Sequence, residues 1–224
     1  MCGRFTLFAP YYDIVERFDI EAAFEENDYV PSYNIAPSQQ VVAIVNDGEK
    51  NRLGNLRGGL IPPWAKDEKI GYKMINARAE TVSERPSYKN AFKKKRCIIP
   101  ADSFYEWKNT ENGKIPMRFK LKSNGIFALA GLWESWKSPE GKTIHTCTVI
   151  TTMPNELVKP VHNRMPVILR PEDEAAWLSP NSEDLDFLGN LLVPFDEGEM
   201  DAYPVSSSVN SPRNNDESLI IQVE

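Results

Sequence analysis

The second residue of the chain offers the clearest reactive chemistry. Removal of Met1, which a small residue at position 2 permits, would leave Cys2 with an amine and a thiol on neighbouring carbon atoms. In unperturbed peptides the amine titrates at about 8 and the thiol at about 8.5, so a useful fraction of each is nucleophilic near neutral pH. Such an aminothiol condenses with an aldehyde to an imine, and the thiol then closes a thiazolidine ring. We therefore expect Cys2 to be a covalent nucleophile, against the alternative of a small packed cysteine.

Three further residues could move protons or hold a polar ligand. His162 has an imidazole that can give or take a proton near neutral pH. Glu106 stands between two aromatic residues, where a half-buried carboxylate needs a partner or a raised pKa. Asn76, two residues before Arg78, could fix a ligand whose phosphate the arginine binds. Each also has an ordinary structural interpretation: a packed histidine, an outward-facing glutamate and an asparagine that caps a turn.

The elements that would position these residues are mostly strands. Runs of β-branched and aromatic residues between Gly and Pro predict strands, and residues 126–133 are apolar on both faces, as in a buried central strand. Strands and helices do not alternate regularly, so we expect an α+β fold with a mostly antiparallel, barrel-like β core flanked by helices. The predicted strands are residues 41–45, 56–61, 97–99, 104–107, 117–121, 126–133 and 143–151, and the predicted helices are residues 10–18, 154–158, 171–178 and 183–192. A polar loop over residues 206–217 precedes a last predicted strand, 219–223.

Length and composition indicate one globular domain spanning residues 1–224. The chain has 224 residues, 41% of them hydrophobic and 26% charged, which is ordinary for a packed domain. The longest apolar run is well short of the roughly 18 to 20 residues that span a bilayer, and no secretory signal is recognisable. We expect a cytoplasmic protein with no membrane span.

Cysteine usage and charge narrow the classes further. The three cysteines and two histidines fit neither a disulfide framework nor a zinc site, so we expect no metal or cofactor. The net charge of −6 disfavours indiscriminate coating of nucleic acid, but one basic stretch could face phosphates or be a solvated helix face. That stretch contains Arg78, Arg85, Lys89, Lys93, Lys94, Lys95 and Arg96.

Seven motifs follow one another along the chain. They are MCGRF at 1–5, YNIAP at 33–37, GLIPPW at 59–64, NARAET at 76–81, RCIIPA at 96–101, FYEW at 104–107 and HNRMP at 162–166. Together they resemble one family, the SOS response-associated peptidase (SRAP) family, which senses abasic sites in single-stranded DNA. The resemblance runs from residue 1 to about residue 209, and the order of the motifs makes it far more specific than any one of them.

The resemblance implies a protein that attaches Cys2 to the ring-opened aldehyde of an abasic site, shielding the DNA. The family name also records a proposed peptidase activity, which could amount to removal of the protein's own Met1. We expect a monomer, as the default for a protein that must fit one lesion. On this basis Asn76 holds the N-terminal residue and the sugar, Glu106 assists proton transfer, and His162 helps to open the sugar. The partner would be single-stranded DNA containing abasic sites, with bases stacked on aromatic side chains. The implied phosphate contacts are Arg4, Arg78, Arg85 and Arg164, and the implied base contacts are Trp64 and Pro37.

Two positions depart from the family pattern. Gly58 stands where the family commonly has a tryptophan, and Asn163 stands where an aspartate commonly follows the histidine. The first departure could weaken packing under the DNA groove, and the second removes an acidic neighbour of His162. Neither touches the four residues implied in the chemistry.

Two other functional classes stay open. Glutamine amidotransferases also begin Met-Cys-Gly and use a free amine as base, so an amidohydrolase or a cysteine protease with an N-terminal nucleophile is an alternative. The other alternative is a non-catalytic module that binds single-stranded DNA while Cys2 merely packs. Release of ammonia from glutamine would indicate the first, and salt-sensitive binding without an adduct would indicate the second.

Overall fold

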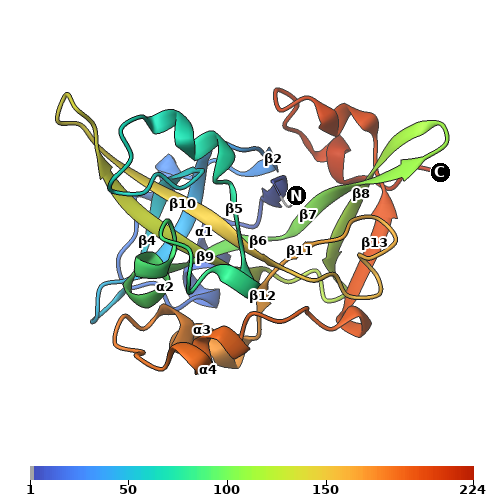
Figure 1. Ribbon diagram of the computed structural model, residues 1–224. Helices are drawn as coiled ribbons and strands as arrows, with labels where there is room; N and C mark the ends of the chain where they lie inside the picture. Colours follow the sequence, from blue (N-terminus) through green and yellow to red (C-terminus); the bar gives the residue numbers. More distant parts are fainter. Residues whose placement is uncertain (1–2) are drawn as a thin grey trace.

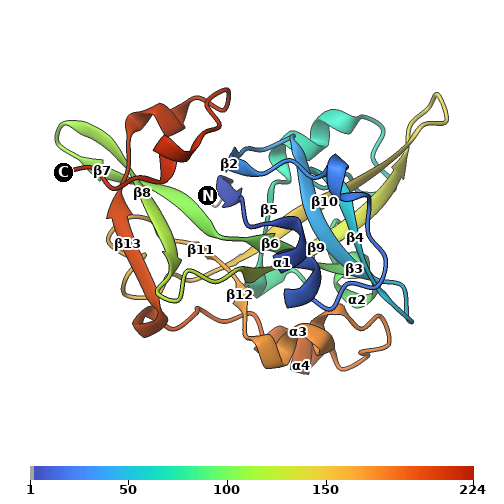
Figure 2. The same cartoon turned by 180° about the vertical axis from the view of Figure 1, so that it is seen from behind.

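Two sheets make up the molecule in a computed structural model that describes residues 3–224 (Figure 1). One sheet closes into a barrel and the other extends from it (Figures 1 and 2). The barrel strands are β3 (Gln40–Asn46), β4 (Asn51–Gly58), β6 (Arg96–Ala101), β9 (Phe127–Lys137) and β10 (Thr143–Thr152).

The barrel closes because β10 pairs on both sides. It runs parallel to β4 and antiparallel to β9, while β3 and β6 complete the ring through antiparallel pairs. The short strands β5 (Asn76–Arg78), β11 (Met165–Pro166) and β12 (Ile168–Leu169) add to β10 and β9. This mixed but mainly antiparallel barrel confirms the predicted α+β fold with a barrel-like core.

The second sheet brings the first strand against the C-terminal part of the chain. Its order is β13 (Met200–Pro204), β8 (Gly113–Leu121), β7 (Ser103–Thr110), β1 (Phe5–Leu7) and β2 (Ser32–Ile35), all antiparallel. The 3-10 helices η5 (Ser207–Asn210) and η6 (Glu217–Ile220) lie beyond β13 and cover one end of this sheet (Figure 1).

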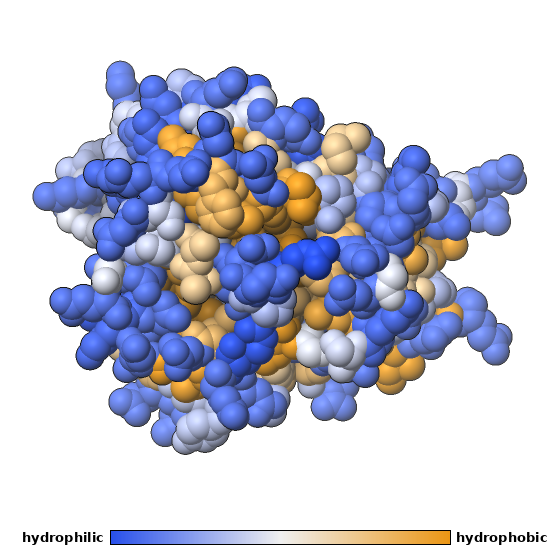
Figure 3. Space-filling model, turned by 90° about the horizontal axis from the view of Figure 1, so that it is seen from below, coloured by the Kyte–Doolittle hydropathy of each residue, from blue (hydrophilic) through white to orange (hydrophobic). Residues whose placement is uncertain are grey.

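Short helices flank the barrel. They are α1 (Tyr11–Arg17), α2 (Lys89–Lys94), α3 (Pro171–Leu178) and α4 (Leu185–Asn190), with further 3-10 turns η1 (Glu26–Asp28), η2 (Glu68–Lys73), η3 (Ala79–Thr81) and η4 (Glu197–Glu199). Arg17 joins α1 to α3 through two bonds to Glu174, of 2.9 and 2.6 Å. Figure 3 looks at the molecule from below, where apolar side chains gather between polar ones.

Three sequence expectations differ from the structure. Residues 154–158 form a turn rather than a helix, because the Asn155 side chain accepts from the Val158 amide and donates to the Phe195 carbonyl. The strand expected at 56–61 begins at residue 51 and stops at Gly58, since Gly59 has a φ of +102° and lies against the Gly71 backbone. The strand expected at 219–223 is mainly the 3-10 turn η6 and retains only one bridge, Val205 to Gln222.

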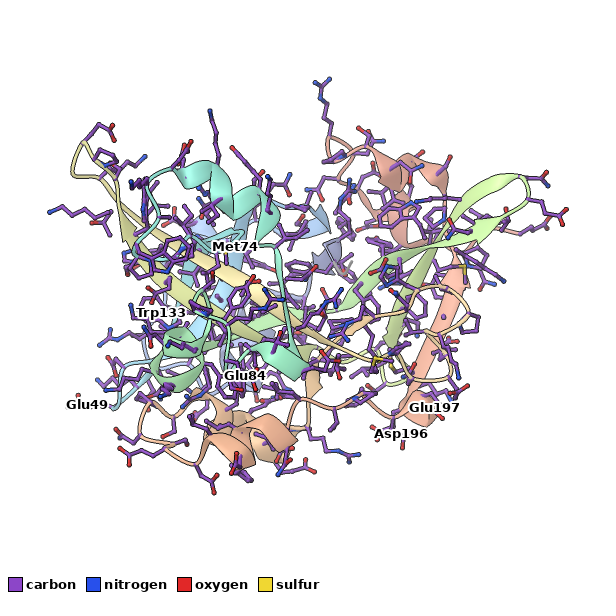
Figure 4. The ribbon with its side chains drawn as sticks, viewed as in Figure 1. Glu49, Met74, Glu84, Trp133, Asp196 and Glu197 are labelled. Carbon is purple, nitrogen blue, oxygen red and sulfur yellow. The ribbon has the colours of Figure 1, made fainter. Side chains whose placement is uncertain are left out.

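The hydrophobic core fills the barrel and continues under α3. Figure 4 draws the side chains on the ribbon in the view of Figure 1. Trp177 of α3 is fully buried and donates its indole N–H to the Cys97 carbonyl over 3.0 Å. Within residues 3–224, no helix has the length and apolar character required to cross a bilayer.

Candidate functional site

The first strand, β1, sets the position of the first described residues. Phe5 pairs with Phe104 on β7 and with Ile35 on β2, and the Tyr105 amide donates to the Arg4 carbonyl over 2.9 Å. Cys2, the expected nucleophile, lies outside the described residues. Gly3 follows it and lines a small cavity at the barrel, so the described chain begins beside that cavity.

Residues of the N-terminal strand β1 and of the barrel strands β4 and β10 line the cavity together. Thr148 of β10 is 1% exposed, and its hydroxyl has no hydrogen-bond partner among residues 3–224. Gly58, one of the two departures from the family pattern, also borders the cavity, and a Cβ there would meet only ordinary contacts, at 3.4 Å and beyond. The lining residues are Gly3, Phe5, Ala36, Pro37, Val41, Gly58, Gly59, Ile75, Ile99, Cys147, Thr148 and Val149.

The structure brings two of the expected catalytic residues together. Glu106 Oε1 lies 3.9 Å from His162 Nδ1, although the residues are on different elements, β7 and the segment between β10 and β11. The Glu106 side chain is 3% exposed and that of His162 is 25% exposed. The Arg164 backbone N–H donates to His162 Nδ1 over 3.1 Å, and this hydrogen bond fixes the orientation of the imidazole ring. A buried carboxylate beside a partly accessible imidazole can pass a proton between the interior and a bound ligand.

Asn76 is anchored at the start of β5. It pairs with Val149 of β10, and its side-chain amide donates to the Val149 carbonyl over 3.5 Å. The Tyr88 hydroxyl donates to the Asn76 backbone carbonyl over 3.2 Å, and burial raises the pKa of Tyr88 to about 12, so this hydroxyl keeps its proton. Ile75, the residue before Asn76, lines the cavity. Asn76 is therefore placed next to the cavity from which the N-terminal strand begins.

Arg164 is held by a carboxylate that sequence reasoning did not single out. Its two terminal nitrogens bind the two oxygens of Glu80 at 2.5 and 2.9 Å, and one of them also donates to the Thr151 carbonyl. The hydrogen bond from Arg164 lowers the pKa of Glu80, as expected for a carboxylate paired with a guanidinium. Glu80 lies inside the motif at residues 76–81, so its place beside Arg78 was the available signal.

Arg4 is oriented by the C-terminal part of the chain. Its guanidinium donates to the Val209 and Asn210 carbonyls at 2.7 and 3.1 Å and to the Asn34 side chain at 2.8 Å. It also lies over the Trp107 ring. No sequence pattern indicates the contacts with Val209 and Asn210, because these partners are backbone carbonyls about two hundred positions away in a polar segment.

The remaining expected DNA contacts are spread over the surface near the barrel. Trp64 is 59% exposed, and its loop is fixed because Trp136 donates its indole N–H to the Ala65 carbonyl over 2.7 Å. Arg78 and Arg85 are exposed, and Pro37 borders the cavity.

The basic stretch does not form a single surface, because its last two residues, Lys95 and Arg96, are engaged within the protein. Arg96 is 3% exposed and its guanidinium donates to the carbonyls of Phe92, Lys93, Trp177 and Ser179. Lys95 pairs with the buried Glu134 at 2.5 Å. These two cations hold α2 and α3 against β6 and β9 instead.

The chain belongs to the SRAP family. The family model described as SOS response associated peptidase (SRAP) matches residues 1–212, so the resemblance drawn from the seven motifs is confirmed. A crystal structure of a protein from Bacteroides thetaiotaomicron has the same fold, with a TM-score of 0.89 and 28% identity over 100% of both chains.

Curated relatives carry one descriptive name. The chain is 62% identical over 221 residues to the abasic site processing protein YoqW of Bacillus subtilis (strain 168), covering 98% of this chain and 99% of the relative. It is 32% identical over 223 residues to the abasic site processing protein HMCES of Xenopus tropicalis, covering 85% of this chain and 66% of that relative.

Proposed function

We propose that this protein processes abasic sites in DNA by attaching its N-terminal cysteine to the lesion. The observation that carries the proposal is the pairing of Glu106 with His162 at 3.9 Å near the start of the chain, with Asn76 fixed beside the same cavity that Gly3 lines. The names of the relatives, abasic site processing proteins, support the class of lesion.

The chemistry requires a free amine at residue 2. The amine nitrogen adds to the aldehyde carbon of the ring-opened sugar, and loss of one water gives an imine. The thiolate then adds to the imine carbon, the nitrogen takes up one proton, and a thiazolidine ring results. No oxidant, reductant or metal enters this balance.

The positions of the described residues support a separate role for each in the reaction and in DNA binding. Glu106, buried and next to His162, supplies and accepts the protons of imine formation and ring closure. His162, with its more exposed ring, acts on the sugar oxygen during ring opening. Asn76 orients the N-terminal residue and the sugar, and Arg4, Arg78, Arg85 and Arg164 bind phosphates, with Trp64 and Pro37 near bases.

Self-removal of Met1 belongs to the same proposal. Glu106 and His162 would serve as proton donors and acceptors in hydrolysis of the first peptide bond, which exposes the amine that the adduct requires. A Met1 that stays in place blocks the imine, so the maturation step precedes the DNA chemistry.

Intact-mass spectrometry tests the function. The purified protein is incubated with a single-stranded oligonucleotide containing one abasic site, and the expected product is the sum of the two masses minus one water, from protein lacking Met1. Cys2→Ala should give no adduct yet keep most of its DNA affinity, because the nucleophile contributes little to phosphate contacts. A protein that lacks Met1 and yields no adduct on single-stranded, junction or duplex DNA would refute the proposal.

A further inference from the structure

The surface of η2 combines exposed aromatic rings with lysines and has no assigned role beyond Trp64. We call this set the η2 platform: Trp64, Lys66, Lys69, Tyr72 and Lys73. Trp64 and Tyr72 are 59% and 60% exposed. Trp64 and the three lysines border a hollow of about 350 Å³, in which Asp67 is the only carboxylate among the described lining residues.

The backbone under the platform is firmly held. The Asp67 side chain accepts from the Lys69 amide over 2.9 Å and begins η2. Glu68 binds Arg57 of β4 at 2.8 Å, so its charge is already used. Gly71 lies against Gly59 so closely that a Cβ on either residue would come within 3 Å of the other's carbonyl oxygen. These contacts fix η2 on the barrel.

The outward side chains of the platform are available, by contrast. Among residues 3–224 we find no hydrogen bond or ion pair that occupies the ammonium groups of Lys66, Lys69 or Lys73. A fixed backbone that presents unpaired cations next to aromatic faces is suited to a single-stranded nucleic acid, in which phosphates follow the cations and bases stack on the rings. A small anion has no face to stack on the two exposed rings, whereas every base of a single strand has one.

The platform is continuous with the candidate site. Only two residues, Met74 and Ile75, separate Lys73 from Asn76, so the Cα atoms of Lys73 and Asn76 lie at most about 11 Å apart. Between them, the Met74 carbonyl accepts from the Leu60 amide over 3.0 Å, and Ile75 lines the cavity beside Gly3. A strand whose lesion lies at that cavity passes directly onto the platform on one side.

We propose that the η2 platform binds the nucleotides on one flank of the lesion, with Lys69 and Lys73 on their phosphates and Tyr72 stacked on a base. This inference rests on the proposed function, because it takes abasic DNA as the ligand. It predicts that DNA binding is asymmetric about the lesion, and that flanking length matters on one side only.

The test compares two charge-neutralised variants in the Cys2→Ala protein, so that binding stays reversible. Lys69→Gln/Lys73→Gln removes two cations from the platform, and Lys93→Gln/Lys94→Gln removes two exposed cations from α2 as the matched control. The probes are fluorescent single strands with an abasic site near the 5′ end, near the 3′ end or in the middle, titrated at several salt concentrations.

The platform variant should show a salt dependence shallower by about 1.4 in log K against log salt, for two lost phosphate contacts on a single strand. The ratio of the binding constant of the unsubstituted protein to that of the platform variant then decreases about sevenfold between roughly 50 and 200 mM salt. This difference should appear on the central probe and on one of the two end probes, whereas the α2 variant keeps the original slope. Equal slopes for both variants on every probe, or equal losses on both end probes, would overturn the inference.

A second comparison separates stacking from charge. Tyr72→Ala should weaken binding to a flank that carries bases, but not to a flank of the same length whose bases have been removed. Tyr72→Phe should bind both flanks normally. An equal effect of Tyr72→Ala on both flanks would remove Tyr72 from the inference.

Adduct formation by the unsubstituted protein is measured on the same central probe. If the platform variant shows the shallower salt dependence on one flank but the unsubstituted protein forms no adduct, the role of the platform is supported and the covalent function is refuted. If adducts form and the slopes are equal, the covalent function stands and the platform fails.

Discussion

Glu106 and His162 are brought close together by the fold, although they lie on different elements of the chain. The sequence marked both as candidates, and the aromatic neighbours of Glu106 indicated its burial, which the structure places at 2% exposure. Their proximity could not be predicted, because the 3.9 Å contact joins β7 to a segment more than fifty residues later. Glu80 and Tyr88, which hold Arg164 and Asn76, were missed because each acts through another residue.

Glu106→Gln should slow adduct formation while leaving the protein folded. The amide keeps the size of the side chain but cannot exchange the protons of imine formation, so we expect a loss of about 10² to 10⁴ in rate. Single-turnover kinetics on excess abasic DNA measure this rate, and the melting temperature serves as the folding control. A variant that crosslinks at the normal rate would assign Glu106 to packing alone.

The Glu80–Arg164 pair gives a pH-dependent contribution to stability. Because the pKa of Glu80 is lowered in the folded protein, the pair contributes above the unfolded pKa of about 4.3 and is lost as the pH falls through the lower folded value. Glu80→Gln should therefore melt at a lower temperature at pH 7, and the two curves should converge below about pH 4. A difference that persists unchanged at acid pH would contradict this assignment.

At the scale of elements, the sequence pattern predicted the longer strands, missed β1, β2, β5, β11, β12 and β13, and failed where side chains cap turns. The barrel strands β3, β6, β9 and β10 follow their β-branched and apolar runs. Asn155 and Asp216 instead hold local turns through bonds to neighbouring amides, and strand and helix patterns do not register such bonds. Closure of the barrel, which depends on the parallel pairing of β10 with β4, is not visible in any local pattern.

The contact between α1 and α3 should be worth more than an ordinary surface ion pair. Glu174 is 8% exposed and burial raises its pKa, so Arg17→Ala would leave a buried carboxylate without its partner. We expect Arg17→Ala to lower the free energy of unfolding by about 2 kcal/mol at pH 7. Arg17→Ala/Glu174→Gln should recover part of that loss, and additive losses in the urea-denaturation cycle would show that the two side chains do not interact.

At the scale of the whole molecule, hydrogen bonds hold the C-terminal segment over residues 206–224 against the N-terminal strands β1 and β2. Asn34 is 1% exposed and its amide donates to the carbonyls of Val209, Ser211 and Asn214. The Tyr105 hydroxyl donates to the Tyr33 and Leu219 carbonyls. The sequence predicted the first part of this segment as a surface loop, because its polar residues gave no hint that their backbone carbonyls are used.

Asn34→Ala tests this fastening. Loss of buried hydrogen bonds should cost about 2 kcal/mol and lower the melting temperature by about 4 to 8 °C in a chain of this size. Asn109→Ala, at an exposed hairpin position, is the control and should melt normally. The adduct yield of Asn34→Ala should fall together with the ordering of Arg4, which shares the Val209 carbonyl. A normal melting temperature for Asn34→Ala would show that the C-terminal segment contributes little to holding the strand.

Closure of the barrel also bears on the order in which local and long-range strand pairs form during folding. The parallel partners Gly58 and Cys147 are joined only after the long intervening chain has folded back, and such distant pairing is slow. Asn76 depends on the same strand, β10, for its side-chain anchor. We therefore expect the local hairpins to form early in folding and the surroundings of Asn76, which depend on β10, to form late.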